Sequence, residues 1–290
     1  MFAITVRRVI SRVSIMTEQD MTQQQQQRFQ LRTNAELIQI ARNRPADLID
    51  GFVPSGSVMV LAGGSSTGKS FTALSWAAAI AEGSSWFGQQ TRQAPVVYVL
   101  GEGFSGFGRR IKTWEIFNGR PMSDNLHFMD GLTYGIDLND PDSVQQLIAM
   151  LAYVQPGLVI FDSLSMLARY SNENDSAEVA HVMANVNKIV QATGATAMLV
   201  QHIMESTEPM EPSVSVFVGN ADTGVVVAED TRENATGTFL LSTEAQYGGK
   251  QRDGEARTLY GFKIDSPGVL SRYGNSATAY PDSNTQPREG

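Results

Sequence analysis

The sequence predicts an α/β fold in which a mostly parallel central sheet has helices on both faces and antiparallel strands in its C-terminal part. Three observations lead to this prediction. Between residues 57 and 202, short apolar runs alternate with helix-forming segments, a pattern typical of parallel sheets. Four of these runs end at polar or glycine residues. Beyond residue 222, apolar runs follow one another through turns without long helices.

We divide the 290 residues into an N-terminal arm (1–33), one folded domain (34–265) and a disordered tail (266–290). The arm contains the glutamine run Gln23–Gln27, and the tail is rich in Ser, Asn, Pro and Gly. Residues 1–15 are apolar and basic and lack acidic residues. They are a targeting peptide, a stretch before the natural start at Met16 or Met21, or an arm that packs on a neighbouring subunit.

The expected elements of the domain follow in chain order. Thr33 and Glu36 form a capping box that opens a short helix ending before Pro45. Asp140 with Pro141, and Asp175 with Glu178, begin two later helices. The predicted strands are Ser57–Ala62, Val96–Leu100, Asn125–Met129, Gly157–Phe161, Ala195–Val200, Thr223–Ala228, Gly237–Ser242 and Thr258–Ile264. The predicted helices between them are Ser70–Ala81, a segment with Arg109, Arg110 and Lys112 that runs to about Phe117, one running to Val154, and one ending at Gly194.

The composition excludes several classes of protein. The net charge of −8 is incompatible with a basic surface over the whole chain, so any contact with nucleic acid is local. The chain has no cysteine, which excludes disulfides and thiolate metal sites. Its three histidines form no ligand cluster in the sequence, and its apolar runs are too short to span a bilayer. We therefore expect a cytoplasmic protein without membrane contact.

The most informative motif runs from Gly63 to Ser70 and fits the pattern Gly-x-x-x-x-Gly-Lys-Ser/Thr at every fixed position. It lies between a predicted strand and a predicted helix, as a phosphate-binding loop requires. Backbone N–H groups and the helix N-terminus can bind a polyphosphate there, Lys69 can reach the β- and γ-phosphates, and Ser70 can hold Mg²⁺. The motif predicts ATP and Mg²⁺ as ligands, bound by Gly63, Gly64, Ser65, Ser66, Thr67, Gly68, Lys69, Ser70 and Phe71.

Polar residues at the ends of the other parallel strands should lie beside this loop, because ligands bind at the carboxyl ends of strands in open α/β sheets. Asp162 is a candidate Mg²⁺ ligand or a helix cap. Glu102, between two glycines, is a candidate for activating the attacking water or an exposed loop carboxylate. Gln201 and His202 can sense the γ-phosphate, or are ordinary residues at the end of a strand.

Two cations lie far along the chain, in the segment Lys250-Gln-Arg252, where we expect a turn between strands. Lys250 and Arg252 can act in trans on the nucleotide of a neighbouring subunit. The alternative is a solvated hairpin tip.

Taken together, these residues resemble the RecA/DnaB-type ATPases, most closely the small RepA-like hexameric helicases of plasmids and phages. The resemblance covers roughly residues 34–265 and rests on the phosphate loop, Val97–Gly103 with Arg109 downstream, Leu158–Ser163, Val200–His202 and Lys250–Arg252. It implies a RecA-like P-loop NTPase core that hydrolyses ATP, with Glu102 as catalytic base and Lys250 and Arg252 reaching across a subunit interface. It also implies a ring that threads single-stranded nucleic acid.

The chain departs from this family in the segment of the expected channel loop. Residues 203–220 contain Glu205, Glu208 and Glu211, and no Lys or Arg occurs between Lys188 and Arg232. Phosphate contacts normally need positive charge, although backbone N–H groups or stacking on Phe217 can replace it. Three hypotheses follow: a DNA motor of the replicative helicase kind, a phage-type RecA-like recombinase or annealing protein, and a nucleotide-switched assembly ATPase that binds a protein. The acidic loop favours the third.

Overall fold

The computed structural model describes residues 31–170, 175–202, 217–232, 237–265 and 269–272. The chain divides into two units, Met1–Arg44 and Pro45–Gly290. In the described part of the first unit, one helix, α2 (Asn34–Arg42), begins at the predicted capping box. Thr33 N donates to Glu36 Oε2 (2.8 Å) and Glu36 N donates to Thr33 Oγ1 (3.3 Å), and no residue of α2 is buried.

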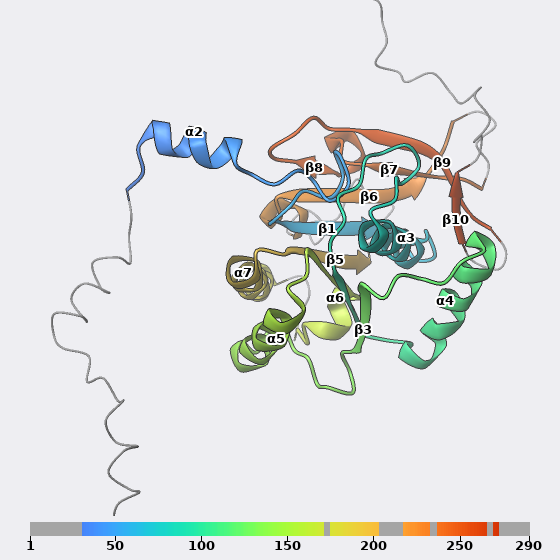
Figure 1. Cartoon of the computed structure of the whole chain (residues 1–290), viewed down its shortest axis with the longest axis horizontal. Coiled ribbons are helices and arrows are strands. Elements are labelled where there is room, and N and C mark those ends of the chain that lie inside the picture. Colours follow the sequence, from blue (N-terminus) through green and yellow to red (C-terminus); the bar gives the residue numbers. More distant parts are fainter. Residues whose placement is uncertain (1–30, 171–174, 203–216, 233–236, 266–268, 273–290) are drawn as a thin grey trace, which may run out of the picture. The chain divides into compact units, whose positions relative to one another are not determined.

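The second unit is built on one sheet of ten described strands, shown in Figure 1. Nine of them lie in the order β10-β9-β7-β6-β1-β5-β4-β2-β3, and β8 pairs with β6. The strands from β6 to β3 in this order are parallel to one another, and the remaining pairs are antiparallel. The strands are β1 (Val58–Gly63), β2 (Val96–Leu100), β3 (Leu126–Asp130), β4 (Leu158–Asp162), β5 (Thr196–His202), β6 (Thr223–Glu229), β7 (Phe239–Ser242), β8 (Lys250–Gln251), β9 (Thr258–Asp265) and β10 (Val269–Arg272).

Helices cover both faces of this sheet, as the sequence predicts (Figure 1). The helices are α3 (Lys69–Glu82), α4 (Phe104–Asn118), α5 (Pro141–Val154), α6 (Leu164–Leu167) and α7 (Ser176–Thr193), with the 3₁₀ turn η3 (Ala245–Tyr247). Alternate residues of the strands point to opposite faces. One set packs with α3 and with Phe107 of α4, and the other packs with α5, α6 and α7. The predicted fold class, a RecA-like P-loop core, is therefore confirmed.

The predicted helix starts are also confirmed. Asp140 accepts hydrogen bonds from the N–H groups of Asp142 (3.1 Å) and Ser143 (3.3 Å) at the start of α5. Asp175 accepts from Ala177 N (2.8 Å) and Glu178 N (3.4 Å) at the start of α7. These caps satisfy donors that a helix leaves without partners in its first turn.

Two details of the C-terminal part differ from the prediction. Lys250 and Gln251 form the short strand β8 and do not form a hairpin tip, because they pair with Gly224 and Thr223 at the start of β6. Residues Val269–Arg272 form β10 against β9 and are not part of an irregular tail. Both differences result from pairing with strands that the local sequence does not specify.

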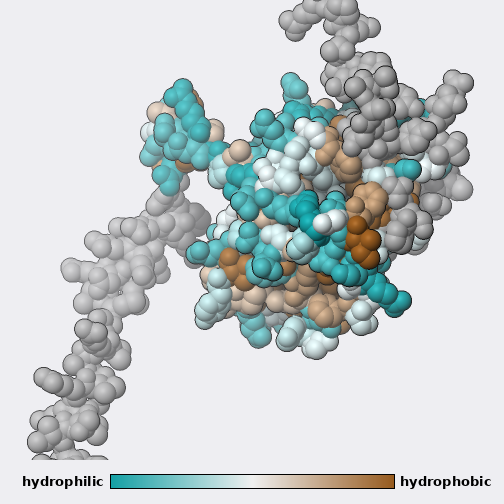
Figure 2. All heavy atoms as spheres, turned by 45° about the vertical axis from the view of Figure 1, so that its right-hand side comes forward, coloured by the Kyte–Doolittle hydropathy of each residue, from teal (hydrophilic) through white to brown (hydrophobic). Residues whose placement is uncertain are grey.

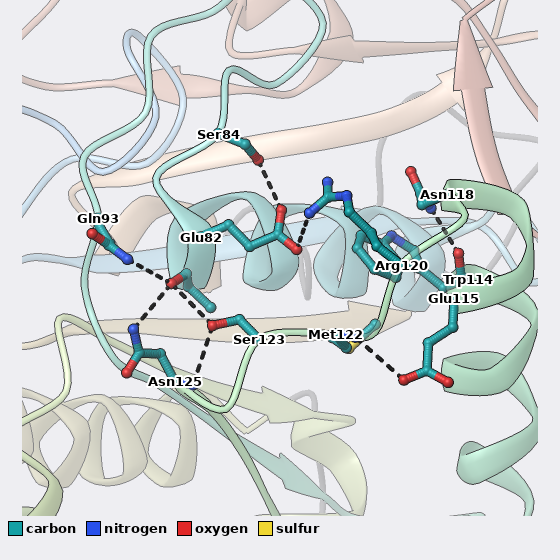
Figure 3. Close-up of polar contacts among 11 residues, drawn as sticks. Glu82, Ser84, Gln93, Trp114, Glu115, Asn118, Arg120, Met122, Ser123 and Asn125 are labelled. Atoms are coloured by element: carbon teal, nitrogen blue, oxygen red, sulfur yellow. Dashed lines mark hydrogen bonds and ion pairs between the residues drawn. The ribbon is translucent and has the colours of Figure 1, made fainter.

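The C-terminal end of α3 is anchored by three side chains from two loops (Figure 3). Gln93 Nε2 (3.3 Å), Ser123 Oγ (3.4 Å) and Asn125 Nδ2 (3.3 Å) all donate to Ala81 O. Next to it, the Arg120 guanidinium forms an ion pair with Glu82. These contacts tie α3 to the loops before β2 and β3, and thereby fix the direction of a helix whose other end is the phosphate loop.

No helix in the described part of the chain is long and apolar enough to cross a membrane. The same residues contain no group of three or more His, Asp or Glu side chains placed to hold a metal ion by themselves.

Candidate active site at the carboxyl ends of the parallel strands

The loop Gly63–Ser70 leaves the end of β1 and enters α3 at Lys69. Gly68 has φ 90°, in the left-handed region, where a side chain would be strained. A Cβ atom on Gly63 would lie 2.5 Å from Val227 O of β6, so this position also requires glycine. The first N–H groups of α3 have no acceptor within the helix and are available to an anion in the loop.

Lys69 is the buried cation of this loop. Its residue is only 4% exposed, and Nζ donates to Gly64 O at 2.5 Å. Burial lowers the pKa of Lys69 from 10.5 to about 8, because the charged ammonium loses its hydration, and the nearby Asp162 carboxylate opposes this shift. A polyphosphate bound here would favour the protonated form of Lys69.

Asp162 ends β4 and is 5% exposed. The Tyr98 hydroxyl donates to Asp162 Oδ2 at 2.6 Å. Burial of Tyr98, followed by the Asp162 charge, raises the pKa of the phenol well above its usual value of 10.0, so the hydroxyl remains a donor. Tyr98 therefore fixes the orientation of the carboxylate. The sequence analysis did not predict this role. Tyr98 is the one residue with a polar side chain in the otherwise aliphatic run of β2, and this pattern could have indicated a buried hydrogen bond.

Glu102 lies beside Asp162 at the same edge of the sheet. Gly101 N donates to Asp162 O (2.7 Å), which ties the end of β2 to the end of β4. Gly103, in the left-handed region with φ 63°, begins α4 directly after Glu102. The Glu102 side chain is exposed and has no hydrogen bond or ion pair with any described residue. It is an exposed carboxylate at the carboxyl end of β2, next to the end of β4.

Gln201 and His202 end β5, the neighbour of β1. Their register partners are Ala62 and Gly63, so both lie beside the start of the phosphate loop. Gln201 is 4% exposed, and its Oε1 has no hydrogen-bond partner in the described part of the chain. A buried amide oxygen without a partner is unfavourable unless a ligand or water completes it. His202 is exposed.

The remaining loop residues surround this centre. Ser65 and Ser66 are exposed, whereas Thr67 and Ser70 are half-buried, and the Thr67 hydroxyl donates to Gly64 O (3.0 Å). Phe71, also half-buried, has the Arg110 guanidinium of α4 5.1 Å from its ring centre. These residues complete the edge of the site between the loop and α4.

Lys250 and Arg252 do not join this group of residues. Arg252 Nη1 donates to Asp222 Oδ1 (2.5 Å), and Val58 N donates to Asp222 Oδ2 (3.0 Å). Lys250 Nζ donates to Gly219 O (2.7 Å) and Ala221 O (2.6 Å). Val58 begins β1 and the phosphate loop follows its other end, so the length of β1, roughly 17 Å, separates the cations from their own loop.

The local environment of these cations is partly buried. Burial lowers the pKa of Lys250, Arg252 lowers it further, and Asp222 opposes both effects. The side chain of Arg252 remains 53% exposed in its ion pair with Asp222. Both cations thus have fixed positions at the amino ends of β1 and β6, with donors directed away from their own phosphate loop.

Comparison with known proteins gives one family match. The AAA domain family AAA_25 matches residues 23–207, which include the phosphate loop, Glu102, Asp162, Gln201 and His202. No protein with a curated function matches the chain by sequence. Among solved structures, a KaiC-like protein from the hyperthermophilic archaeon Pyrococcus horikoshii OT3 aligns with 18% identity over 77% of this chain and 93% of its own, with a TM-score of 0.46.

Proposed function

The chain belongs to this AAA domain family of P-loop ATPases, which indicates a nucleotide-hydrolysing activity. From that premise we propose that the protein is a Mg²⁺-dependent ATPase. We propose that it works as an oligomeric motor on single-stranded DNA, as RepA-like replicative helicases do. The observation on which the proposal depends is the buried arrangement of Lys69 at the start of α3, Asp162 at the end of β4 and Tyr98 in β2. A buried lysine with a pKa of about 8 beside a phosphate-binding loop is suited to an anionic ligand.

The donor set suits Mg²⁺ together with ATP. Ser70 supplies a half-buried hydroxyl at the second residue of α3. Asp162 supplies a carboxylate of which Tyr98 holds one oxygen, leaving the other available to the ion or to its water. Held by Ser70 and Asp162, Mg²⁺ would neutralise the charge of phosphate oxygens. Lys69 exchanges its bond to Gly64 O for the β- and γ-phosphates.

Three further residues have roles in turnover. Glu102 orients the attacking water and accepts its proton. Its carboxylate is exposed and has no partner among the described residues, which allows this role. Gln201 senses the γ-phosphate through its amide group at the end of β5. Its buried Oε1 has no partner in the part of the chain that the structure describes, which supports a ligand-dependent contact. His202, at the rim, contacts the same phosphate.

Lys250 and Arg252 complete the site of a neighbouring copy. Their position beyond the far end of β1 supports action in trans and argues against action on the nucleotide of their own chain. Each cation keeps donor hydrogens beyond those bound within the chain, since Lys has three and Arg has five. The ATP-bound protein is therefore an oligomer with nucleotide between subunits.

Two other functions use the same catalytic machinery. A phage-type RecA-like recombinase would anneal or exchange strands without unwinding them. A nucleotide-switched assembly ATPase would bind a protein, and the three glutamates between residues 203 and 216, which lie outside the described residues, favour that candidate.

The test is steady-state ATP hydrolysis with and without single-stranded DNA over a salt series. The proposal predicts stimulation that fades as salt rises, because phosphate contacts release counterions. Directional strand displacement then supports the helicase, and annealing without displacement supports the recombinase. Hydrolysis that ignores DNA at every salt concentration contradicts the DNA motor and favours the assembly ATPase.

A further inference from the structure

Four glycines lie next to Glu102 and in the first two turns of α4, at positions 101, 103, 106 and 108. Steric requirements explain the first two. A Cβ atom on Gly101 would lie 2.8 Å from Met166 Cβ, so this position has no room for a side chain. Gly103 has φ 63°, in the left-handed region that favours glycine.

Gly106 and Gly108 have no such explanation. A Cβ atom on either would have no described atom within 4 Å, apart from its chain neighbours and the backbone of its own helix. Neither residue has a φ in the left-handed region. Both lie inside α4, where glycine is less favourable than alanine because its flexible backbone loses more entropy on folding. The start of α4 therefore has two weak helix formers that packing does not require.

Few other contacts stabilise the start of α4. Its N-cap residue is a glycine and makes no side-chain cap, and Phe104 and Ser105 in the first turn are both exposed. Only Phe107 and Trp114 among its 15 residues are buried. Figure 2 brings forward the side of the second unit on which α4 lies in Figure 1, and hydrophilic and hydrophobic residues lie side by side there. Segments with few buried contacts open locally at a low cost in free energy.

Phe107 is the first residue of α4 that is fixed in the core. It is 4% exposed, and its ring centre lies 5.2 Å from that of Tyr98 and 5.6 Å from that of Phe128. Gly106 and Gly108 flank it, so the backbone can change direction on either side of a ring that stays in place.

The other end of this segment is fixed as well. Gly101 N donates to Asp162 O at 2.7 Å, which holds the end of β2 against the end of β4. Residues 102–106 thus lie between two fixed points and have few contacts of their own. Glu102, the proposed base, is the first of them.

We propose that residues 102–106 form a hinge that moves the Glu102 carboxylate toward the γ-phosphate when ATP is bound and away from it after hydrolysis. Gly106 and Gly108 are positioning residues for this movement, because they lower the cost of unwinding the start of α4. The proposal rests on the base role of Glu102 in the proposed ATPase. Movements of loops and element ends limit turnover in many enzymes, so stiffening the hinge should slow turnover.

The test replaces Gly106 and Gly108 by alanine, singly and together. Each alanine should raise the Tm by about 2–4 °C, because it strengthens the helix. The kcat for ATP should fall several-fold in the double variant. The dissociation constant for ATP, measured by equilibrium binding, should stay unchanged, because the phosphate loop that binds ATP is not altered. A merely structural role cannot produce a higher Tm together with a lower kcat.

Two control variants lie in the same helix. Ile116→Ala, at a residue that is 71% exposed, also raises helix propensity but lies beyond Phe107, so it should leave kcat unchanged. Ser105→Gly adds a glycine to the hinge and should lower the Tm without lowering kcat. An unchanged kcat in the double alanine variant, or an equal loss of kcat in Ile116→Ala, would overturn the proposal. Weaker ATP binding in the double variant would also overturn it, since the glycines would then make room for the nucleotide.

Amide hydrogen exchange tests the hinge without hydrolysis. In the wild type without nucleotide, the amides of residues 103–108 should exchange several-fold faster than those in the first two turns of α5, which has a side-chain cap. The two alanines should slow this exchange. Equal protection of the two helix starts in the wild type would overturn the hinge even if the protein hydrolyses ATP. Fast exchange in a wild type that does not hydrolyse ATP would instead contradict the proposed ATPase and support the flexibility of this segment.

Discussion

Lys69 gives the most quantitative prediction, because its environment disfavours its own charge. In the absence of nucleotide its pKa is about 8 in the folded chain, against 10.5 for an ordinary lysine. At about 1.36 kcal/mol per pKa unit, holding the ammonium in the folded state costs about 3 kcal/mol at pH 7. Lys69→Met removes the charge and keeps the length of the side chain. It also removes the hydrogen bond to Gly64 O, which contributes about 1 kcal/mol.

The net expectation is that Lys69→Met stabilises the nucleotide-free protein by about 2 kcal/mol at pH 7. The sign follows from linkage. The folded pKa lies below the unfolded one, so between pH 8 and 10.5 the unfolded chain binds more protons, and the stability of the wild type rises with pH. The destabilisation of the wild type by the buried ammonium has its full value of about 3 kcal/mol below pH 8. At pH 9.5 it falls to about 1.4 kcal/mol, close to the contribution of the lost hydrogen bond, so the two proteins should be almost equally stable there.

The assay is urea unfolding of wild type and Lys69→Met from pH 7 to 9.5, with the slope on urea checked for equality. Lys112→Met is the matched control, because it makes the same substitution at a side chain that is 71% exposed. A Lys69→Met protein that is less stable than wild type at pH 7 would refute the reasoning. So would a difference between the two proteins that does not change with pH.

Three further outcomes follow from the site and the fold. Glu102→Gln should bind ATP with unchanged affinity and lose turnover by about 10²–10⁴-fold, because the amide cannot accept a proton; normal single-turnover hydrolysis would remove Glu102 from the base role. Tyr98→Phe should raise the Mg²⁺ concentration needed for half-maximal ATPase and destabilise the fold by about 1–3 kcal/mol, because Asp162 loses its buried donor; an unchanged Mg²⁺ titration would mean that the hydroxyl does not orient the carboxylate. Asp140→Ala should lower the free energy of unfolding by about 1 kcal/mol, because α5 loses its N-cap, and should leave ATPase activity unchanged. Asp142 lies in the first turn of α5 but is not the N-cap, so an equal loss of stability in Asp142→Ala would argue against capping.

Sequence reasoning located those parts of the site that depend on local patterns. The phosphate loop is defined by residue spacing. Asp162 directly follows the apolar run that forms β4, and Glu102 lies two residues after the apolar run that forms β2. Parallel strands bring such ends to one edge, so the grouping of Lys69, Asp162 and Gln201 was predictable without knowledge of strand order.

What the sequence left open depends on pairing between distant segments. The bond from Tyr98 to Asp162 joins residues 64 positions apart and results from the adjacency of β2 and β4. Lys250 forms β8 because it pairs with Gly224, a contact that no local signal at Lys250 indicates. The same pairing places Arg252 near Val58, at the end of β1 opposite the phosphate loop.

The aliphatic face of α2 shows a different limit. The capping box predicted the helix and its start, because capping depends on residues three positions apart. The capping box gives no information on the tertiary contacts of α2, whose apolar residues Leu37, Ile38 and Ile40 are exposed.

The central claim is an ATPase site completed by a second copy, and subunit mixing tests it most directly. Lys69→Ala lacks the phosphate-binding cation and Arg252→Ala lacks the cation proposed to act in trans, so each protein alone should be nearly inactive. In an equal mixture, about one interface in four combines an intact loop with an intact Arg252, and turnover should recover in proportion. Arg257→Ala, which removes a nearby arginine paired with Asp50, should remain active alone. Recovery of turnover on mixing supports the shared site, and an inactive mixture at every ratio, or an Arg252→Ala protein with full activity alone, contradicts it.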